Sequence, residues 1–330
     1  MIEVEHLTKY YGDFLAVNDL SFKIEDKHVY GLLGPNGAGK STTMNILTGC
    51  LSLSEGTVKI GGHDILEEPE SAKRLIGYLP EQPPLYLNET VTEYLTFVGE
   101  AKGLKSKELK KQIEEVIQEV GLEDVKNRII SKLSKGYKQR VGIAQALLAH
   151  PEIIILDEPT VGLDPLQIIE IREFIKNLGK DHTVILSSHI LSEVQAICEK
   201  VLIISKGKLV AFDTPENLEK LMVTTSTIVF EVQASNEEIS SILKDIQGIK
   251  TFNVTNKNGS SLVEVTLEEN INAKEICGKI TICFAKKDIA VYEMHTNKAN
   301  LEDVFLELTE TSNEENNQEE SEEEVDDCNL

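Results

Sequence analysis

The chain has 330 residues, 41% of them hydrophobic and 27% charged, which is an ordinary composition for a globular protein. Its net charge of −23 argues against a general nucleic-acid surface, and its apolar runs are only as long as a strand, so neither a membrane span nor a signal peptide is predicted. Five scattered cysteines without a CxxC pair argue against a disulfide framework or a zinc site and favour a reducing cytosol.

The first part of the chain, residues 1–220, alternates strands and helices, as an α/β domain requires. Alternating apolar and polar residues predict antiparallel strands near the N-terminus. Between about residues 85 and 150, apolar residues at helical spacing, with lysines and glutamates between them, predict a helical insertion. Strand signals fall within 1–12, 20–25, 28–34, 56–65, 152–159, 182–189 and 200–212, and helix signals within 40–49 and 166–177.

The second part of the chain carries a different pattern. Strand and helix signals follow the order βαββαβ, which predicts a small α+β domain of ferredoxin-like fold at 221–310. The signals fall at 227–232, 237–246, 250–255, 261–267, 273–280 and 290–295, with a last helix at 300–309. Residues 311–330 are an acidic tail that is predicted to be disordered, because almost nothing in it is apolar. Dimer contact, regulation or partner docking is expected of this part.

The stretch GLLGPNGAGKSTT at 31–43 fits the pattern G-x-x-x-x-G-K-[ST], with an apolar strand before it and a helix after it. Gly34 and Gly39 permit a close backbone approach in which N–H groups point into one concavity, where the helix start adds partial positive charge. Lys40 is predicted to reach the β- and γ-phosphates of a nucleotide, and Ser41 to bind Mg²⁺. The predicted nucleotide-binding residues of this loop are Gly34, Asn36, Gly37, Ala38, Gly39, Lys40, Ser41 and Thr42.

A second element, IIILDEPT at 153–160, is an apolar strand that ends in two adjacent acids. Acids after a strand are usually helix caps or solvated residues, but the phosphate loop upstream favours a catalytic role here. In the P-loop arrangement, Asp157 holds Mg²⁺ through water, and Glu158 polarises the attacking water as a general base.

Between these two elements lies LSKGYKQR at 133–140, followed by VGIAQALLAHPEIIILDEPTVGLDP. In order and spacing, the motifs of residues 1–220 resemble those of the nucleotide-binding subunit of an ATP-binding cassette (ABC) transporter. The resemblance implies a P-loop NTPase core with an antiparallel β subdomain and a helical insertion, in which two chains sandwich two ATP molecules. Ser134 and Gly136 would then contact the γ-phosphate of ATP bound to the opposite chain.

The resemblance assigns further residues one at a time. Tyr11 resembles the aromatic residue that stacks on adenine, with Tyr10 as a close competitor and an ordinary strand-end tyrosine as the alternative. Gln82, in GYLPEQ, resembles the glutamine that touches Mg²⁺ or water and links the site to the helical insertion. Asp164 resembles the acid at the dimer seam, and His189 resembles the switch histidine that contacts the γ-phosphate, although a lone histidine after a strand is usually structural.

The chain departs from the usual family signature, LSGGQ, at two positions. Lys135 replaces a glycine and Tyr137 replaces the glutamine, whereas the serine and the second glycine remain. We therefore expect an intact ATPase site with altered ribose or seam contacts. The SKGY form, together with the C-terminal domain, resembles ATPases of ABC-2-type exporters, including the multidrug and gliding-motility groups.

The resemblance implies an ATPase at the inner, cytoplasmic face of the cell membrane that energises a separate membrane-spanning permease for export. ATP and Mg²⁺ would be its cofactors, and its working form would be a homodimer or a heterodimer. One alternative is an ABC ATPase acting on ribosomes or DNA, which the single cassette, the lack of a long coiled coil and the acidic balance disfavour. Another is a non-hydrolysing scaffold, which the intact set of Lys40, Asp157, Glu158 and His189 disfavours. The sequence does not identify the cargo.

Overall fold

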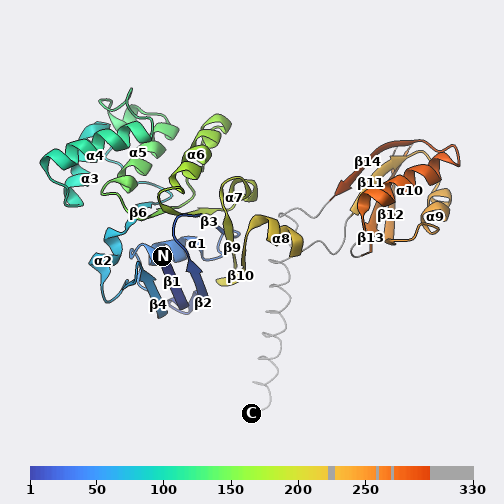
Figure 1. Cartoon of the computed structure of the whole chain (residues 1–330), viewed down its shortest axis with the longest axis horizontal. Helices are drawn as coiled ribbons and strands as arrows, with labels where there is room; N and C mark the ends of the chain where they lie inside the picture. The colour runs from blue at the N-terminus through green and yellow to red at the C-terminus, as the bar shows by residue number, and fades with distance from the viewer. Residues whose placement is uncertain (222–226, 258–259, 269–270, 298–330) are drawn as a thin grey trace, which may run out of the picture. The chain divides into compact units, whose positions relative to one another are not determined.

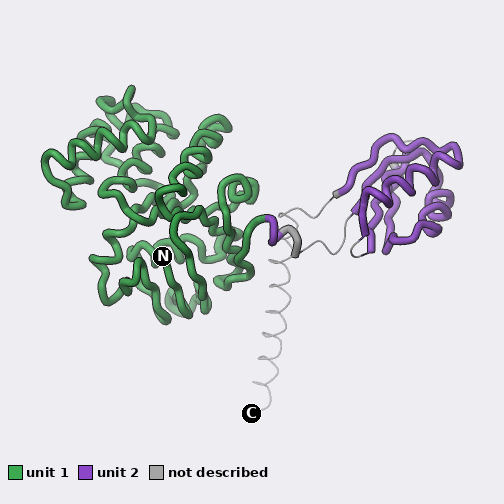
Figure 2. Tube along the Cα trace, viewed as in Figure 1, with its two compact units in different colours: residues 1–215 green, residues 216–330 purple. Residues whose placement is uncertain are grey.

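The computed structural model describes residues 1–221, 227–257, 260–268 and 271–297 (Figure 1). The chain divides into two compact units, Met1–Pro215 and Glu216–Leu330 (Figure 2). The predicted helix at 300–309 and the acidic tail at 311–330 lie outside the described residues. No helix within the described ranges combines the length and the apolar content needed to cross a bilayer.

The first unit is built on a six-stranded sheet. Its strands, in spatial order, are β10 (Lys208–Asp213), β9 (Lys200–Ser205), β3 (Val29–Leu33), β8 (Thr183–Ser188), β7 (Ile153–Leu156) and β6 (Ile76–Leu79). All neighbours are parallel except β10 and β9. Every residue of β3, β7 and β8 is buried, as expected for strands that are covered on both faces. Because β8 lies between β3 and β7, the loops that leave these three strands meet at one edge of the sheet.

A second, antiparallel sheet of the first unit has the order β2-β1-β4-β5. It consists of β1 (Ile2–Tyr11), β2 (Phe14–Ile24), β4 (Glu55–Ile60) and β5 (His63–Asp64). Its apolar face shares one core with the six-stranded sheet and with α1 (Lys40–Leu47). The strand predicted at 20–25 is the second half of β2, which begins six residues earlier because the turn at 12–13 is tight enough to pair Tyr11 with Phe14.

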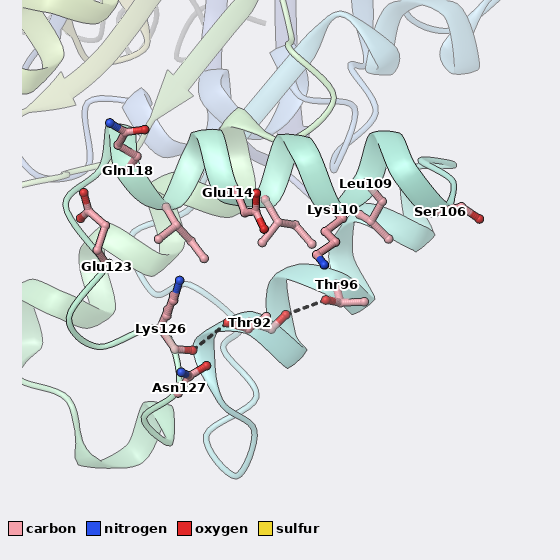
Figure 3. Close-up of a pocket in the computed structure, with 12 residues that line it drawn as sticks. Thr92, Thr96, Ser106, Leu109, Lys110, Glu114, Gln118, Glu123, Lys126 and Asn127 are labelled. Carbon is pink, nitrogen blue, oxygen red and sulfur yellow. Dashed lines mark hydrogen bonds between the residues drawn. The ribbon is translucent and has the colours of Figure 1, made fainter.

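The predicted helical insertion lies between β6 and β7, and its helices gather on one side of the first unit (Figure 1). It contains α3 (Val91–Ala101), α4 (Ser106–Glu119), the short 3-10 helix η1 (Ile130–Lys132) and α5 (Lys135–Leu147). A capping box formed by Thr90 and Glu93 fixes the start of α3. A cavity of about 790 Å³ opens between α3 and α4, where Thr92 and Thr96 face Leu109 and Glu114 (Figure 3).

The remaining helices described in the first unit pack against its strands. They are α2 (Pro69–Arg74), α6 (Pro165–Leu178) and α7 (Leu191–Ile197), and α8 (Pro215–Leu221) begins where the unit ends. Pro165 stands at the first position of α6, where its missing N–H is not needed by the helix. The α/β core, the antiparallel subdomain and the helical insertion confirm the fold that the sequence predicts for this part.

The second unit has the predicted order of elements. They are β11 (Thr227–Val232), α9 (Asn236–Leu243), β12 (Ile249–Lys257), β13 (Ser260–Leu267), α10 (Ala273–Ala285) and β14 (Val291–Asn297). The strands form one antiparallel sheet in the order β12-β13-β11-β14, which is the ferredoxin-like arrangement. Phe230 and Phe284 pack edge to face in its core, with ring centroids 5.4 Å apart. The helix α10 extends five residues beyond the predicted end at 280.

Candidate active site

The glycine loop follows β3 directly and ends where α1 begins. Gly39 is the N-cap of α1 with φ of 101°, a conformation that favours glycine, and a Cβ there would lie 2.7 Å from the carbonyl oxygen of Ala16. A Cβ on Gly34 would collide with the carbonyl oxygen of Ile204. The close approaches that require these glycines are therefore to the backbones of β2 and β9, in addition to any approach by a phosphate.

Lys40 lies inside this loop. Its Nζ donates hydrogen bonds to the carbonyl oxygens of Gly34, at 2.7 Å, and Pro35, at 3.2 Å. The residue is only 6% exposed, and this burial lowers the pKa of its ammonium, while Glu158 and Asp157 act in the opposite direction. The ammonium is thus held by the loop itself, in the concavity where a phosphate would bind.

Ser187, at the end of β8, joins the two acids that follow β7. Its hydroxyl donates to Asp157 Oδ1, at 2.5 Å, and accepts from the N–H of Glu158, at 2.9 Å. Glu158 has a φ of 49°, in the left-handed region that non-glycine residues rarely occupy. Sequence reasoning missed Ser187, although it is the first serine of the SSH stretch at the end of a buried strand.

Glu158 and His189 form a close pair. His189 Nδ1 lies 3.0 Å from both carboxylate oxygens of Glu158. The side chain of Glu158 is 11% exposed and that of His189 is 44% exposed, so the pair stands at the mouth of a cleft. Because these residues follow the neighbouring parallel strands β7 and β8, sheet topology brings them together from positions 31 residues apart.

A cleft of about 380 Å³ unites most of the predicted nucleotide site. Its lining residues are Tyr11, Phe14, Ala16, Asn36, Gly37, Gly39, Lys40, Ser41, Thr42, Glu81, Glu158, Val161 and His189. The loop residues Gly34 and Ala38 are buried beneath this lining, as is Asp157. The arrangement combines a phosphate loop, an ammonium, a carboxylate–imidazole pair and aromatic rings in one cleft.

At the aromatic end of the cleft, Tyr11 is among the lining residues and Tyr10 is not. The Lys9 ammonium lies 5.5 Å from the centre of the Tyr11 ring, a cation–π distance. Phe14, which is 66% exposed, lines the same end, because the hairpin register places it opposite Tyr11. Sequence reasoning missed Phe14, whose only signal is its position just after the predicted turn.

The structure does not bring Gln82 into the cleft lining; its neighbour Glu81 lies there instead. Both residues are exposed and follow Pro80 after the end of β6. The residue that follows GYLP in this chain is thus the carboxylate Glu81, and the predicted amide, Gln82, is one position later in the sequence. The only sequence signal that favours Glu81 over Gln82 is its position one residue closer to the end of the strand.

The signature residues lie apart from this cleft. Ser134 is the N-cap of α5, and its hydroxyl accepts from the N–H of Tyr137 at 3.4 Å. Gly136, Tyr137 and Asp164 line a different cavity, of about 540 Å³. Asp164 also caps α6 by accepting from the N–H of Gln167 at 2.9 Å. Within one chain, therefore, the phosphate loop and the signature loop line separate cavities.

Lys135, the first residue of α5, reaches the segment that leads to Asp164. A Cβ on Gly162 would collide with the Lys135 ammonium. Gly162 has a φ of 71°, so its backbone also favours glycine. Lys135 therefore contacts the segment that leads to Asp164 in its own chain.

Comparison with known proteins agrees with this geometry. The family model described as "ABC transporter" matches residues 17–161. The uncharacterized ABC transporter ATP-binding protein YhcH of Bacillus subtilis is 35% identical, over 96% of this chain and 98% of its own length. The linearmycin resistance ATP-binding protein LnrL of the same species is 34% identical, over 94% and 98%.

Solved structures show the same fold. The dimeric structure of the ATP-binding cassette MJ0796 in a post-hydrolysis state, bound to ADP and Pi, has a TM-score of 0.60 and 27% identity. The structural match covers 65% of this chain and 98% of the MJ0796 chain. A phosphate loop facing a carboxylate–imidazole pair, on a fold shared with hydrolysing cassettes, is the arrangement of an ATPase. The chain therefore belongs to the ATP-binding proteins of ABC transporters, the ATP-hydrolysing subunits that energise transport.

Proposed function

We propose that this chain drives export through a separate ABC-2-type permease, to which it binds at the inner face of the cell membrane. The observation that carries the proposal is the single cleft in which Lys40 of the phosphate loop lies with the Glu158–His189 pair. Similarity to a linearmycin resistance protein over nearly the whole chain supports an exporter. An action on ribosomes or DNA has no comparable support.

The arrangement of the cleft supports a separate role for each of its functional residues. Lys40 exchanges its two carbonyl partners for the β- and γ-phosphates of ATP, while Tyr11 and Phe14 offer rings on which the base stacks. Glu158 accepts a proton from the water that attacks the γ-phosphate, because its carboxylate lines the same cleft as the phosphate loop and is held by His189. His189 orients that carboxylate through Nδ1.

We further propose that Mg²⁺ binds here with ATP. Among the described residues, no group of three or more His, Cys, Asp or Glu side chains would hold a metal on its own. Mg²⁺ commonly takes one or two protein oxygens and completes its shell with phosphates and water, so the oxygen donors present fit it. Ser41 and Asp157 would hold it, directly or through water, together with Glu81 or Gln82. When bound, it would neutralise charge on the phosphates.

Replacing Glu81 and Gln82 separately distinguishes these two residues. Glu81→Ala is expected to raise the Mg²⁺ concentration for half-maximal ATPase activity by about tenfold, because a carboxylate near the ion is lost. Gln82→Ala is expected to change it by less than about twofold, since Gln82 is outside the cleft lining. Mg²⁺ titrations of ATPase activity, with Mn²⁺ binding followed by electron paramagnetic resonance, measure both. The opposite ranking would restore Gln82 to the site.

We propose that two chains pair head to tail, as homodimer or heterodimer. Ser134, Lys135, Gly136 and Tyr137 would then face ATP bound to the opposite chain, with Asp164 at the seam. The separate cavities of the phosphate and signature loops support this, because the single chain does not bring the two loops into one cavity. Exposed apolar side chains near the seam also support it: Val161, Leu166, Ile169 and Ile190.

We propose that the permease docks on an apolar patch formed by Tyr86, Leu87 and Phe97, which follow Glu81 in the chain. Each is about half exposed, and the rings of Tyr86 and Phe97 lie 5.0 Å apart. Exposed aromatic clusters are typical of binding surfaces. The short segment between Glu81 and this patch would carry motion from the nucleotide to the membrane protein.

A pull-down tests the proposed partner. The tagged full chain, incubated with detergent-solubilised membranes of its own cells, is expected to retain one multi-spanning membrane protein in stoichiometric amount. Phe97→Asp should reduce recovery by about tenfold or more, because a buried charge opposes docking. Leu66→Asp, at a similarly exposed apolar residue of the same unit, is the matched control. Recovery of ribosomal or DNA-bound proteins without a membrane protein would contradict the proposal.

A further inference from the structure

A buried carboxylate outside the nucleotide cleft joins three segments of the site. Glu193, on α7, is only 2% exposed. Its Oε2 accepts hydrogen bonds from the hydroxyls of Thr160, at 2.7 Å, and Ser188, at 3.0 Å. Its Oε1 lies 3.4 Å from a terminal nitrogen of the Arg172 guanidinium. A buried carboxylate is costly unless partners of this kind replace its lost hydration.

The contact with Ser188 reaches the loop that carries His189. Ser188 directly precedes His189, and its hydroxyl also accepts from the N–H of Ile190 at 3.0 Å. The turn that presents the imidazole is therefore closed around the Ser188 hydroxyl. The Ser188 hydroxyl donates a hydrogen bond to Glu193, so the carboxylate fixes the orientation of the group that shapes the turn.

The other contacts reach the segment that follows Glu158 and the helix that begins after Asp164. Thr160 lies two residues after Glu158, in the turn that leads to Asp164, and is 4% exposed. Arg172 belongs to α6, the helix that Asp164 caps. The Arg172 side chain is 26% exposed, and a terminal nitrogen of its guanidinium faces Glu193. Within the described part of the chain, its Nε atom is buried without a hydrogen-bond partner.

We propose that Glu193 is a positioning residue for ATP hydrolysis. It ties the His189 turn to the segment between Glu158 and Asp164, so that engagement of Asp164 at a dimer seam changes the geometry of the Glu158–His189 pair. Two hydrogen bonds to one buried carboxylate hold the segments that donate them in one arrangement more strictly than apolar packing would. The inference rests on ATP hydrolysis in the cleft and does not depend on the proposed permease.

Removing the carboxylate tests the inference through turnover. Glu193→Ala is expected to lower kcat by about 10- to 100-fold, because small displacements of catalytic groups have effects of that size. KM for ATP should change by less than about twofold, since no contact of Glu193 belongs to the phosphate loop. Glu199→Ala is the matched control: that carboxylate is 54% exposed and bonds His28 instead. Its kcat should equal that of the wild-type chain.

If Glu193→Ala does not fold, two single variants, Glu193→Gln and Arg172→Met, and their double variant test the inference instead. Glu193→Gln retains an oxygen for the two hydroxyls but leaves Arg172 unpaired, and Arg172→Met leaves the carboxylate without its cation. The double variant removes both charges and keeps the acceptor. The kcat of the double variant should be within about threefold of the wild type, and the kcat of each single variant should be lower than that of the double variant. A double variant less active than both single variants would overturn the inference.

A second readout needs no turnover and therefore separates this inference from the ATPase activity itself. The His189 imidazole resonance, identified by its loss in His189→Gln, should shift in Glu193→Ala and stay unchanged in Glu199→Ala. An unshifted resonance, or a lower Tm with wild-type kcat per folded molecule, would show that Glu193 serves stability alone. Absence of turnover in the wild-type chain would contradict ATP hydrolysis, and the resonance would still report on Glu193.

Discussion

Glu158→Gln is expected to lower ATP turnover by about 10²- to 10⁴-fold, the usual contribution of a general base. The amide has the shape of the carboxylate and keeps an oxygen for His189, but it accepts a proton poorly. Since the phosphate loop and Lys40 are unchanged, ATP should bind as in the wild type and hold two chains together. Steady-state ATPase assays and size-exclusion chromatography with ATP measure the two effects.

The matched control for this substitution is Glu152→Gln, at an exposed acid just before the same strand. It should leave both turnover and dimerisation unchanged. Full turnover by Glu158→Gln would remove this carboxylate from the mechanism. Loss of ATP binding would instead mean that the residue supports the cleft rather than the reaction.

Ser134→Arg is expected to abolish ATP-driven dimerisation, whereas Tyr137→Gln should preserve it. The serine hydroxyl caps α5 at the point where a partner's γ-phosphate would bind, and a large side chain there blocks that approach. Loss of the cap itself costs only about 1 kcal/mol, so the chain should remain folded. Tyr137 is 38% exposed, and the contact of Ser134 with this residue uses only its backbone N–H, which glutamine retains.

Light scattering in a Glu158→Gln background, with and without ATP, gives the fraction of dimer for each variant. Circular dichroism confirms that both variants are folded before the comparison. A monomeric Tyr137→Gln chain beside a dimeric Ser134→Arg chain would reverse the ranking. The contact to the opposite nucleotide would then belong to the tyrosine that distinguishes SKGY from SGGQ.

Residues that stand within a sequence motif, His189 among them, could be predicted from the sequence, whereas residues that reach the site only through sheet topology could not. The phosphate loop and the adjacent acids Asp157 and Glu158 can be recognised because each directly follows an apolar strand in the sequence. Ser187 contacts Asp157 and Glu193 contacts Thr160, 30 and 33 residues away along the chain, and these contacts exist because β8 lies beside β7.

The same distinction explains the smaller differences. Phe14 joins the cleft through the register of one hairpin, which depends on the length of its turn. Glu81 replaces Gln82 in the lining because a single residue decides which side chain leaves a strand end toward the nucleotide. The βαββαβ order of the second unit was predictable, since each element carries its own apolar period.

The left-handed backbone conformation of Glu158 favours substitution of this residue by glycine in the course of evolution. A glutamate in that conformation costs on the order of 1 kcal/mol relative to glycine, which adopts it freely. A duplicated copy released from the need to hydrolyse ATP would gain stability by mutating to glycine there. Return to glutamate would then carry a penalty before any activity was regained. Loss of catalysis at this position is favoured by folding, and its recovery is opposed.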